Sequence, residues 1–181
     1  MREVRKSGRI GDGQKARARP RATPTHLDGV IRLAVRFLAS RDRTVAQVER
    51  FLLSRGIASS FIEPTICRLT DLRYLDDLAY AQRWVERRLA TKPMGQERLK
   101  AELQAKGISD GLADGVLTEI FRAHGEEVFA SRAMQALSRQ GKRLAPVHIV
   151  RFLHQRGFSD EVIDRMMMEF KRNEDVVHEG E

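Results

Sequence analysis

A short phrase that ends in glycine followed by an apolar residue occurs three times along this chain. It reads Ser-Arg-Gly-Ile at 54–57, Ala-Lys-Gly-Ile at 105–108 and Gln-Arg-Gly-Phe at 155–158. The three glycines, Gly56, Gly107 and Gly157, lie 51 and 50 residues apart. A period of about 50 residues is typical of tandem-repeat proteins, in which one small structural unit is copied and stacked.

Apolar residues flank each glycine at matching offsets. The positions four and eight residues before the glycines hold Leu52, Leu103, Leu153, Val48, Leu99 and Ile149. Further apolar residues follow at plus one, plus five, plus ten and plus thirteen. Any helical protein can contain one helix–glycine–helix phrase by chance, but chance does not reproduce the flanking offsets. A glycine just past a periodic apolar run fits a left-handed helix C-cap, so each phrase is expected to end a helix.

The pattern predicts an all-α protein made of three tandem three-helix repeats, stacked into an elongated, curved body. Runs of β-branched residues are almost absent and Pro is scarce after residue 24, which favours helices over strands. The predicted segments are a disordered basic arm at 1–25, repeats at 26–73, 74–124 and 125–172, and a polar tail at 173–181. Each repeat is too small to bury much apolar surface alone, so neighbouring repeats must stack.

Capping residues set the predicted starts of several helices. Thr44 with Gln47, and Ser60 with Glu63, read as two capping boxes, and Ser159 is expected to cap the last helix. A first helix is predicted over 27–40, with an inward face made of Leu27, Ile31, Val35 and Leu38.

The second repeat opens with the most informative stretch of the chain. Apolar residues recur there at spacings of three and four, which predicts one buried helix face made of Leu75, Leu78, Ala81, Val85 and Leu89. Asp76 and Asp77 fall in the first turn, where carboxylates meet the positive end of the helix dipole. An acid/base or metal pair is the alternative. Neighbouring residues on a helix diverge by about 100°, however, so the two carboxylates cannot converge on one reacting atom.

The net charge of +8 is unevenly spread. Residues 1–25 hold eight Lys and Arg residues against two acids, a net of +6, which leaves about +2 for the remainder. Such an arm can hold phosphates or an acidic surface loosely. A solubilising tail and a misassigned start site are the alternatives.

The residue types needed for catalysis or metal binding do not cluster. His148 and His154 lie six residues apart, on different faces of a helix, and no Cys/His cluster is present. Cys67, the only cysteine, is expected to be a buried structural thiol rather than a nucleophile. No run approaches the roughly 18 apolar residues of a membrane helix. We therefore expect a cytoplasmic binding protein rather than an enzyme, with no catalytic, cofactor-binding or metal-binding residues.

The stretch from Leu75 to Ile108 resembles the RecX family, small bacterial regulators of the RecA recombinase. The resemblance is carried by a Leu-Asp-Asp-x-x-Tyr-Ala-x-x-Trp-Val-x-x-Arg string, by Lys-Pro-x-Gly, and by the second glycine phrase. The family-motif residues are Asp76, Asp77, Tyr80, Ala81, Trp84, Arg87, Gly95 and Gly107. The resemblance covers roughly residues 27–172, and the first and third repeats match mainly through their repeat pattern.

The resemblance implies three tandem three-helix modules and a role in DNA repair, recombination and the SOS response. The protein would bind the RecA–single-stranded DNA filament and inhibit or modulate its ATPase and strand-exchange activity. The expected partners are the filament and DNA, single-stranded or duplex, for a monomer that binds neither membranes nor small molecules. The alternative is a direct DNA-binding protein with helix–turn–helix-like modules and a basic arm. A scaffold with no nucleic-acid role is a third possibility.

Cations in the motif and the glycine phrases are the candidate contacts to filament or DNA. These are Arg83, Arg87, Lys92, Arg98, Lys100, Lys106, Arg55 and Arg156. A solvated surface without a partner is the alternative for them. Tyr80 and Trp84, one turn apart, are expected to pack between helices, and a base-stacking platform is the alternative role.

Overall fold

All regular structure in the computed structural model, which describes residues 24, 26–139 and 145–178, is helical. The helices are α1 Leu27–Leu38, α2 Val45–Ser54, α3 Ser59–Asp71, α4 Asp77–Thr91, α5 Gln96–Ala105, α6 Asp110–His124, α7 Glu126–Ser138, α8 Pro146–Gln155 and α9 Asp160–His178. This confirms the predicted all-α fold. The predicted basic arm, apart from Pro24, lies outside the described residues.

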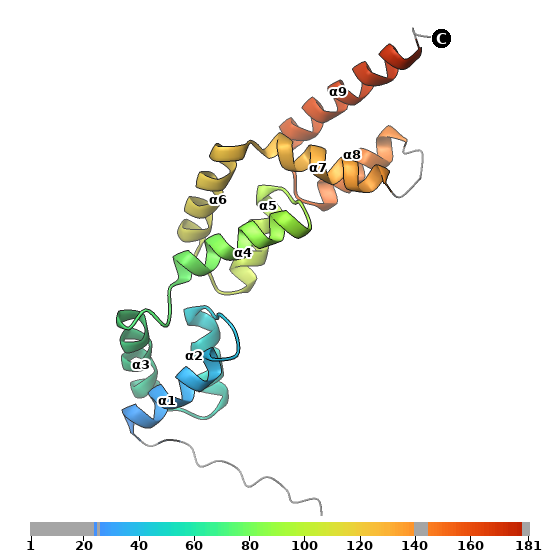
Figure 1. Ribbon diagram of the computed structural model, residues 1–181. Helices are drawn as coiled ribbons and strands as arrows, with labels where there is room; N and C mark the ends of the chain where they lie inside the picture. Colours follow the sequence, from blue (N-terminus) through green and yellow to red (C-terminus); the bar gives the residue numbers. More distant parts are fainter. Residues whose placement is uncertain (1–23, 25, 140–144, 179–181) are drawn as a thin grey trace, which may run out of the picture.

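The helices form an elongated, curved array in three groups (Figure 1). Helices α1, α2 and α3 pack on one another, α6 packs against α4 and α5, and α9 packs against α7 and α8. We call these groups module 1, module 2 and module 3. The elongated helical-repeat architecture is as predicted, whereas the residue boundaries assigned to the repeats remain a prediction. Helix α9 runs to His178, so residues 173–178 of the predicted polar tail are helical.

Each glycine phrase ends a helix in the same way. Gly56, Gly107 and Gly157 have φ values of 73°, 89° and 74°, in the left-handed region. The glycine N–H donates to the carbonyl three residues earlier, and the next N–H donates to the carbonyl five residues earlier. These paired bonds form the Schellman motif, which satisfies carbonyls that the helix leaves free. The apolar residues that follow, Ile57, Ile108 and Phe158, are buried, so each phrase also anchors the turn to the core.

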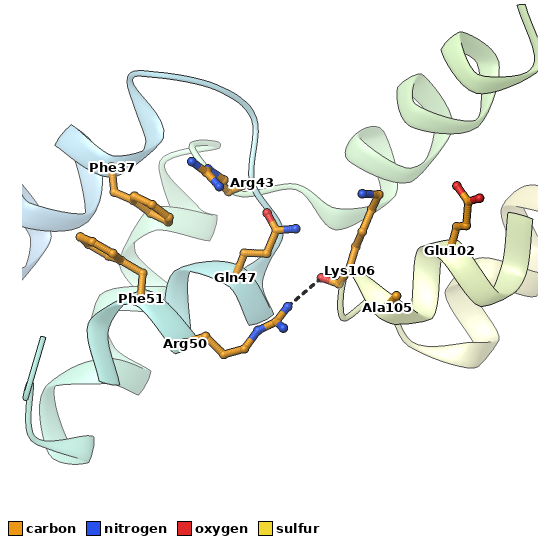
Figure 2. A pocket seen from close by; sticks show the side chains of 8 residues that line it. All are labelled: Phe37, Arg43, Gln47, Arg50, Phe51, Glu102, Ala105 and Lys106. Carbon is orange, nitrogen blue, oxygen red and sulfur yellow. Dashed lines mark hydrogen bonds between the residues drawn. The ribbon is translucent and has the colours of Figure 1, made fainter. Parts of the chain in front are cut away.

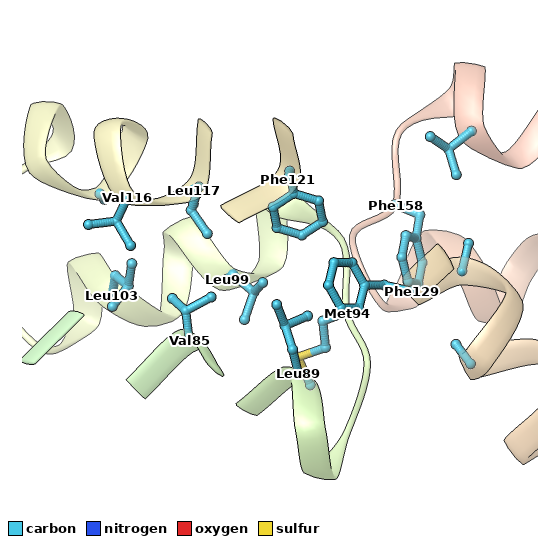
Figure 3. Packing of buried hydrophobic residues seen from close by; sticks show 14 of the residues in the cluster. Val85, Leu89, Met94, Leu99, Leu103, Val116, Leu117, Phe121, Phe129 and Phe158 are labelled. Atoms are coloured by element: carbon cyan, nitrogen blue, oxygen red, sulfur yellow. The ribbon is translucent and has the colours of Figure 1, made fainter. Parts of the chain in front are cut away.

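The apolar core is divided into two separate clusters. The first is confined to module 1 and the residue that leads out of it, and comprises Val30, Ala34, Val48, Leu52, Ile57, Ile62, Leu69 and Leu75. The second runs without a break through modules 2 and 3, where Leu99, Phe121, Phe129 and Phe158 meet (Figure 3). Modules 2 and 3 therefore share a core, whereas module 1 has its own.

Capping agrees with the prediction at one helix and differs at another. Thr44 is the N-cap of α2, and its Oγ1 accepts a hydrogen bond from the N–H of Gln47 at 3.2 Å. Helix α3 begins at Ser59, with Ala58 as its N-cap and no side-chain cap, so the predicted capping box at Ser60 is wrong. The Schellman turn fixes the chain direction one residue earlier, which places Ser60 inside the first turn.

Three predictions of which residues are buried differ from the structure. In α1 the buried residues are Gly29, Val30 and Ala34. Val30 and Ala34 lie one position away from the predicted face, and Ile31, Val35 and Leu38 are half-buried beside them. Leu78 is 48% exposed; it lies in the first turn of α4, before the buried residues Ala81, Val85 and Leu89 of the predicted face. Cys67 is exposed rather than buried. It lies two residues from Thr65 and from Leu69 on α3, and therefore on the face opposite theirs.

Candidate functional site

The modules are joined by the same carboxylate contact twice. At the first joint, between modules 1 and 2, the N–H of Val45 donates to Asp77 Oδ1 at 2.9 Å. At the second joint, between modules 2 and 3, the N–H of Gln96 donates to Glu126 Oε1 at 3.0 Å. Val45 and Gln96 begin α2 and α5, and Asp77 and Glu126 begin α4 and α7. In both joints, a carboxylate from one module caps a free helix N–H of the preceding module.

A second contact also occurs at both joints. Its acceptor is the backbone carbonyl of the residue before Gly107 or Gly157. Thr44 Oγ1 donates to the carbonyl of Lys106 at 2.7 Å, and the N–H of Gly95 donates to the carbonyl of Arg156 at 3.0 Å. Thr44 and Gly95 are the N-cap residues of α2 and α5. The glycine phrase of each later module therefore binds the start of the second helix in the module before it.

At the joints, neighbouring modules approach so closely that three positions have room only for glycine. A Cβ atom on Gly107 would clash with Ala46 in α2, and one on Gly157 would clash with Arg98 in α5. A Cβ atom on Gly95 would clash with the backbone of Gly157. Positions 107 and 157 thus require glycine for two reasons: φ is positive there, and the neighbouring helix is too close for a Cβ atom. The family-motif residues Gly95 and Gly107 both lie in joints.

The two joint carboxylates are half-buried, and this changes their titration. Burial raises the pKa of Asp77, against the hydrogen bond from Val45 and with a further rise from the charge of Asp76. Burial likewise raises the pKa of Glu126, against hydrogen bonds from Gln96 and Ser159. Removal of a carboxylate from water disfavours its charged form, and at both joints this effect exceeds that of the hydrogen bonds.

The remaining motif residues lie in or near α4. Asp76 is its N-cap, and the N–H of Ala79 donates to Asp76 Oδ1 at 2.9 Å. Tyr80 and Ala81 are buried in the core of module 2, and half-buried Trp84 packs against that core. Arg87 is exposed. The packing role expected for Tyr80 and Trp84 fits these positions.

Three of the eight candidate cations form ion pairs. Arg83 lies 2.9 Å from Asp42, across the first joint. Arg98 and Lys100 lie 3.3 Å from Glu102 and 2.7 Å from Asp114, within module 2. The predicted set of contact cations is therefore partly neutralised by carboxylates.

The other five candidates differ in their surroundings. The guanidinium of Arg156 donates to the carbonyl of Pro93 at 2.9 Å, so this half-buried residue helps to hold the second joint. Arg55 and Lys106 lie over the rings of Phe51 and Trp84, each at 5.0 Å. Arg87 and Lys92 are exposed and form no ion pair with any residue that the structure describes.

An open groove of about 610 Å³ lies at the first joint, and we call it the joint groove (Figure 2). Its lining residues are Phe37, Arg43, Gln47, Arg50 and Phe51 from module 1, and Glu102, Ala105 and Lys106 from module 2. Sequence reasoning identified only Lys106 among the groove cations. It missed Arg43 and Arg50 because the groove forms only when two modules meet.

The described residues contain no group of three or more His, Cys, Asp and Glu side chains able to hold a metal ion. No helix among them is both long and apolar enough to cross a membrane.

Helices grouped in threes and joined twice by the same contacts define a protein of tandem three-helix domains. The regulatory protein RecX of Chlorobaculum tepidum is 33% identical over 135 residues, covering 72% of this chain and 81% of that protein. The chain belongs to the RecX family of regulatory proteins.

Further comparisons agree. The family models for the first and second three-helix domains of RecX match residues 31–69 and 76–117. The regulatory protein RecX of Treponema pallidum (strain Nichols) is 30% identical over 135 residues, covering 75% of this chain and 81% of that protein. The crystal structure of RecX from Lactobacillus salivarius has the same fold, with a TM-score of 0.72 at 24% identity, covering 80% of this chain and 96% of that chain.

Proposed function

We propose that this protein binds the RecA–single-stranded DNA filament and inhibits or modulates its ATPase and strand-exchange activity. Membership of a family of regulatory proteins carries this proposal. We further propose that the protein acts as a cytoplasmic monomer on this filament, without a small-molecule ligand.

The modular body suits a polymeric target. The filament presents the same protein surface at regular intervals, and an elongated array can contact several successive subunits. Contacts that are tethered together raise overall avidity even when each one alone is weak. Because the two joints fix the spacing of the modules, the array can favour one filament geometry over another. A ligand that binds one state more tightly shifts the equilibrium toward that state.

Among the candidate contact residues, Arg87 and Lys92 are the best suited to bind the filament. Both side chains are exposed and form no ion pair within the described residues. Arg83, Arg98 and Lys100 would first have to leave the carboxylates that they already contact.

The test is an ATPase assay on preformed RecA filaments, with the full-length protein and with a variant that lacks residues 1–25. We expect substoichiometric protein to slow ATP turnover, because one bound array contacts several subunits. Equal potency of the two proteins would confine the activity to the modules. An unchanged ATPase rate together with binding to bare DNA would refute the proposal and favour the direct DNA-binding alternative. No binding to filament or DNA would favour the scaffold reading.

A further inference from the structure

The joint groove is positively charged and contains few counter-charges. Arg43 and Arg50 lie on its module 1 side, and Lys106 lies on its module 2 side (Figure 2). Among the described residues, Glu102 is the only acid that lines it, and its carboxylate already binds Arg88 at 3.1 Å and Arg98 at 3.3 Å. The three groove cations are therefore not neutralised by that carboxylate.

Two aromatic rings and two guanidinium groups form a four-layer stack at the groove. The rings of Phe37 and Phe51 are stacked at 3.9 Å between centroids, with an interplanar angle of 5°. The guanidinium of Arg43 lies 4.3 Å from the Phe37 centroid, and that of Arg55 lies 5.0 Å from the Phe51 centroid. Each ring already has the other ring on one face, so the guanidinium groups cover the two outer faces. The rings thus fix the positions of two cations by cation–π contact.

The corresponding place at the second joint has different chemistry. A period of 51 residues places Arg88 where module 1 has Phe37, and Glu102 where it has Phe51. Arg88 and Glu102 form a two-bond ion pair, with both distances 3.1 Å. At the second joint this position is thus an ion pair. At the first joint it holds two stacked apolar rings, so the position supplies no carboxylate to the cations of the joint groove.

The donors in the groove have few acceptors within the protein. The Nε atom of Arg43 is buried and has no hydrogen-bond partner among the described residues, so Arg43 can offer a ligand only the terminal nitrogens of its guanidinium. Lys106 forms no ion pair there, and its ammonium group lies over the ring of Trp84. Within the described part of the chain, Arg50 donates only to backbone carbonyls, at 3.1 Å to Ala46 and 3.5 Å to Lys106. Charged donors of this kind, from facing modules, suit an anion with several oxygen atoms.

We propose that the joint groove binds the phosphodiester backbone of nucleic acid and recognises its charge rather than its bases. The outer faces of the Phe37 and Phe51 rings are covered, so these rings offer no free surface for base stacking. The site does not depend on the proposed regulation of RecA, because it would also act on bare DNA.

The test measures binding of fluorescently labelled oligonucleotides by anisotropy as a function of salt, without RecA. The probes are oligo-dT, oligo-dA, an abasic strand of equal length and a duplex. We expect oligo-dT, oligo-dA and the abasic strand to bind alike, since backbone contacts carry no base information. Comparison of the affinities for single strand and duplex then shows which form of nucleic acid the groove binds.

The decisive variant is Arg50→Gln with Lys106→Gln, which removes two groove charges. On single strands each phosphate contact contributes about −0.7 to the log–log salt slope, so the slope should become shallower by about 1.4. The matched control, Arg68→Gln with Arg151→Gln, removes two exposed charges outside the groove and should leave the slope unchanged. Arg43→Lys keeps the charge but loses the planar group, and should weaken binding several-fold. Thermal melting checks that each variant is folded.

Two outcomes would overturn the proposal. One is an unchanged salt slope and affinity in the Arg50 and Lys106 double variant. The other is loss of binding to the abasic strand, which would assign recognition to the bases. Because no RecA is present, failure here leaves the proposed filament regulation untouched, and the ATPase assay tests that separately.

Discussion

Asp77 and Glu126 occupy the same place in successive joints. Each begins the first helix of its own module, and each accepts a hydrogen bond from the first residue of α2 or α5, at 2.9 and 3.0 Å. At the first joint this contact matters more, because module 1 does not share the apolar core of modules 2 and 3. The attachment of module 1 therefore depends strongly on polar contacts.

We predict that Asp77→Ala lowers the free energy of unfolding by about 1 kcal/mol, the usual cost of losing a helix cap. Asp77→Asn keeps an acceptor for the N–H of Val45 without burying a charge, and should be at least as stable as wild type at neutral pH. Chemical denaturation measures both. Asp28→Ala is the control, because Asp28 is exposed in the first turn of α1 and caps no preceding module. Equal loss of stability in Asp77→Ala and Asp28→Ala would contradict this role.

The joint carboxylates also predict an unusual pH dependence. Burial raises the pKa of Asp77 and of Glu126 in the folded state, so the folded protein binds more protons than the unfolded chain between the two pKa values. Their contribution to stability is therefore greatest below the unfolded pKa and is lost as pH rises through the folded pKa.

A double variant, Asp77→Asn with Glu126→Gln, isolates this effect. Its free energy of unfolding, relative to wild type, should rise as pH increases from the acidic range to neutral. Denaturation series of both proteins across that pH range measure the difference in their free energies of unfolding. The contributions of the other carboxylates, which both proteins contain, largely cancel in this difference. A relative stability that falls with increasing pH would show that the hydrogen bonds outweigh burial.

Replacement of the glycine that ends a phrase by alanine separates the cost of backbone strain from the cost of crowding. Gly56→Ala should cost about 1–2 kcal/mol, because its φ is 73° but a Cβ atom there meets nothing within 4 Å. Gly107→Ala should cost about 1–3 kcal/mol more, because its Cβ atom would also overlap Ala46. Urea denaturation gives both values. Equal costs would mean that α2 moves away without penalty.

We predict that Arg87→Ala with Lys92→Ala weakens inhibition of the RecA filament ATPase and leaves the melting temperature nearly unchanged. Both residues are exposed and form no ion pair in the described part of the chain. Arg83→Ala is the comparison, since it breaks an exposed ion pair with Asp42 that is worth no more than about 1 kcal/mol. Full inhibition by the double variant would place the filament contacts elsewhere.

Local features of the fold could be predicted from the sequence, and contacts between modules could not. The glycine at 56, 107 and 157 and the apolar spacing before it are short-range patterns, so they predicted helix ends and the repeat. The contact of Asp77 with Val45 spans 32 residues and requires the packed modules. Arg43 and Arg50 were missed as groove residues for the same reason. Leu78 and Cys67 were misplaced because periodicity gives the angle of a side chain around a helix but not what lies opposite it.

Pro146, the first residue of α8, stands where α2 has Val45 and α5 has Gln96. Proline carries no backbone N–H, so this position has nothing to donate to a carboxylate from a further module. The same linkage cannot be used a third time at α8, either by an added unit or by a second molecule placed head to tail. One residue thus excludes the carboxylate contact at the start of α8, in a protein whose proposed target is an open-ended polymer.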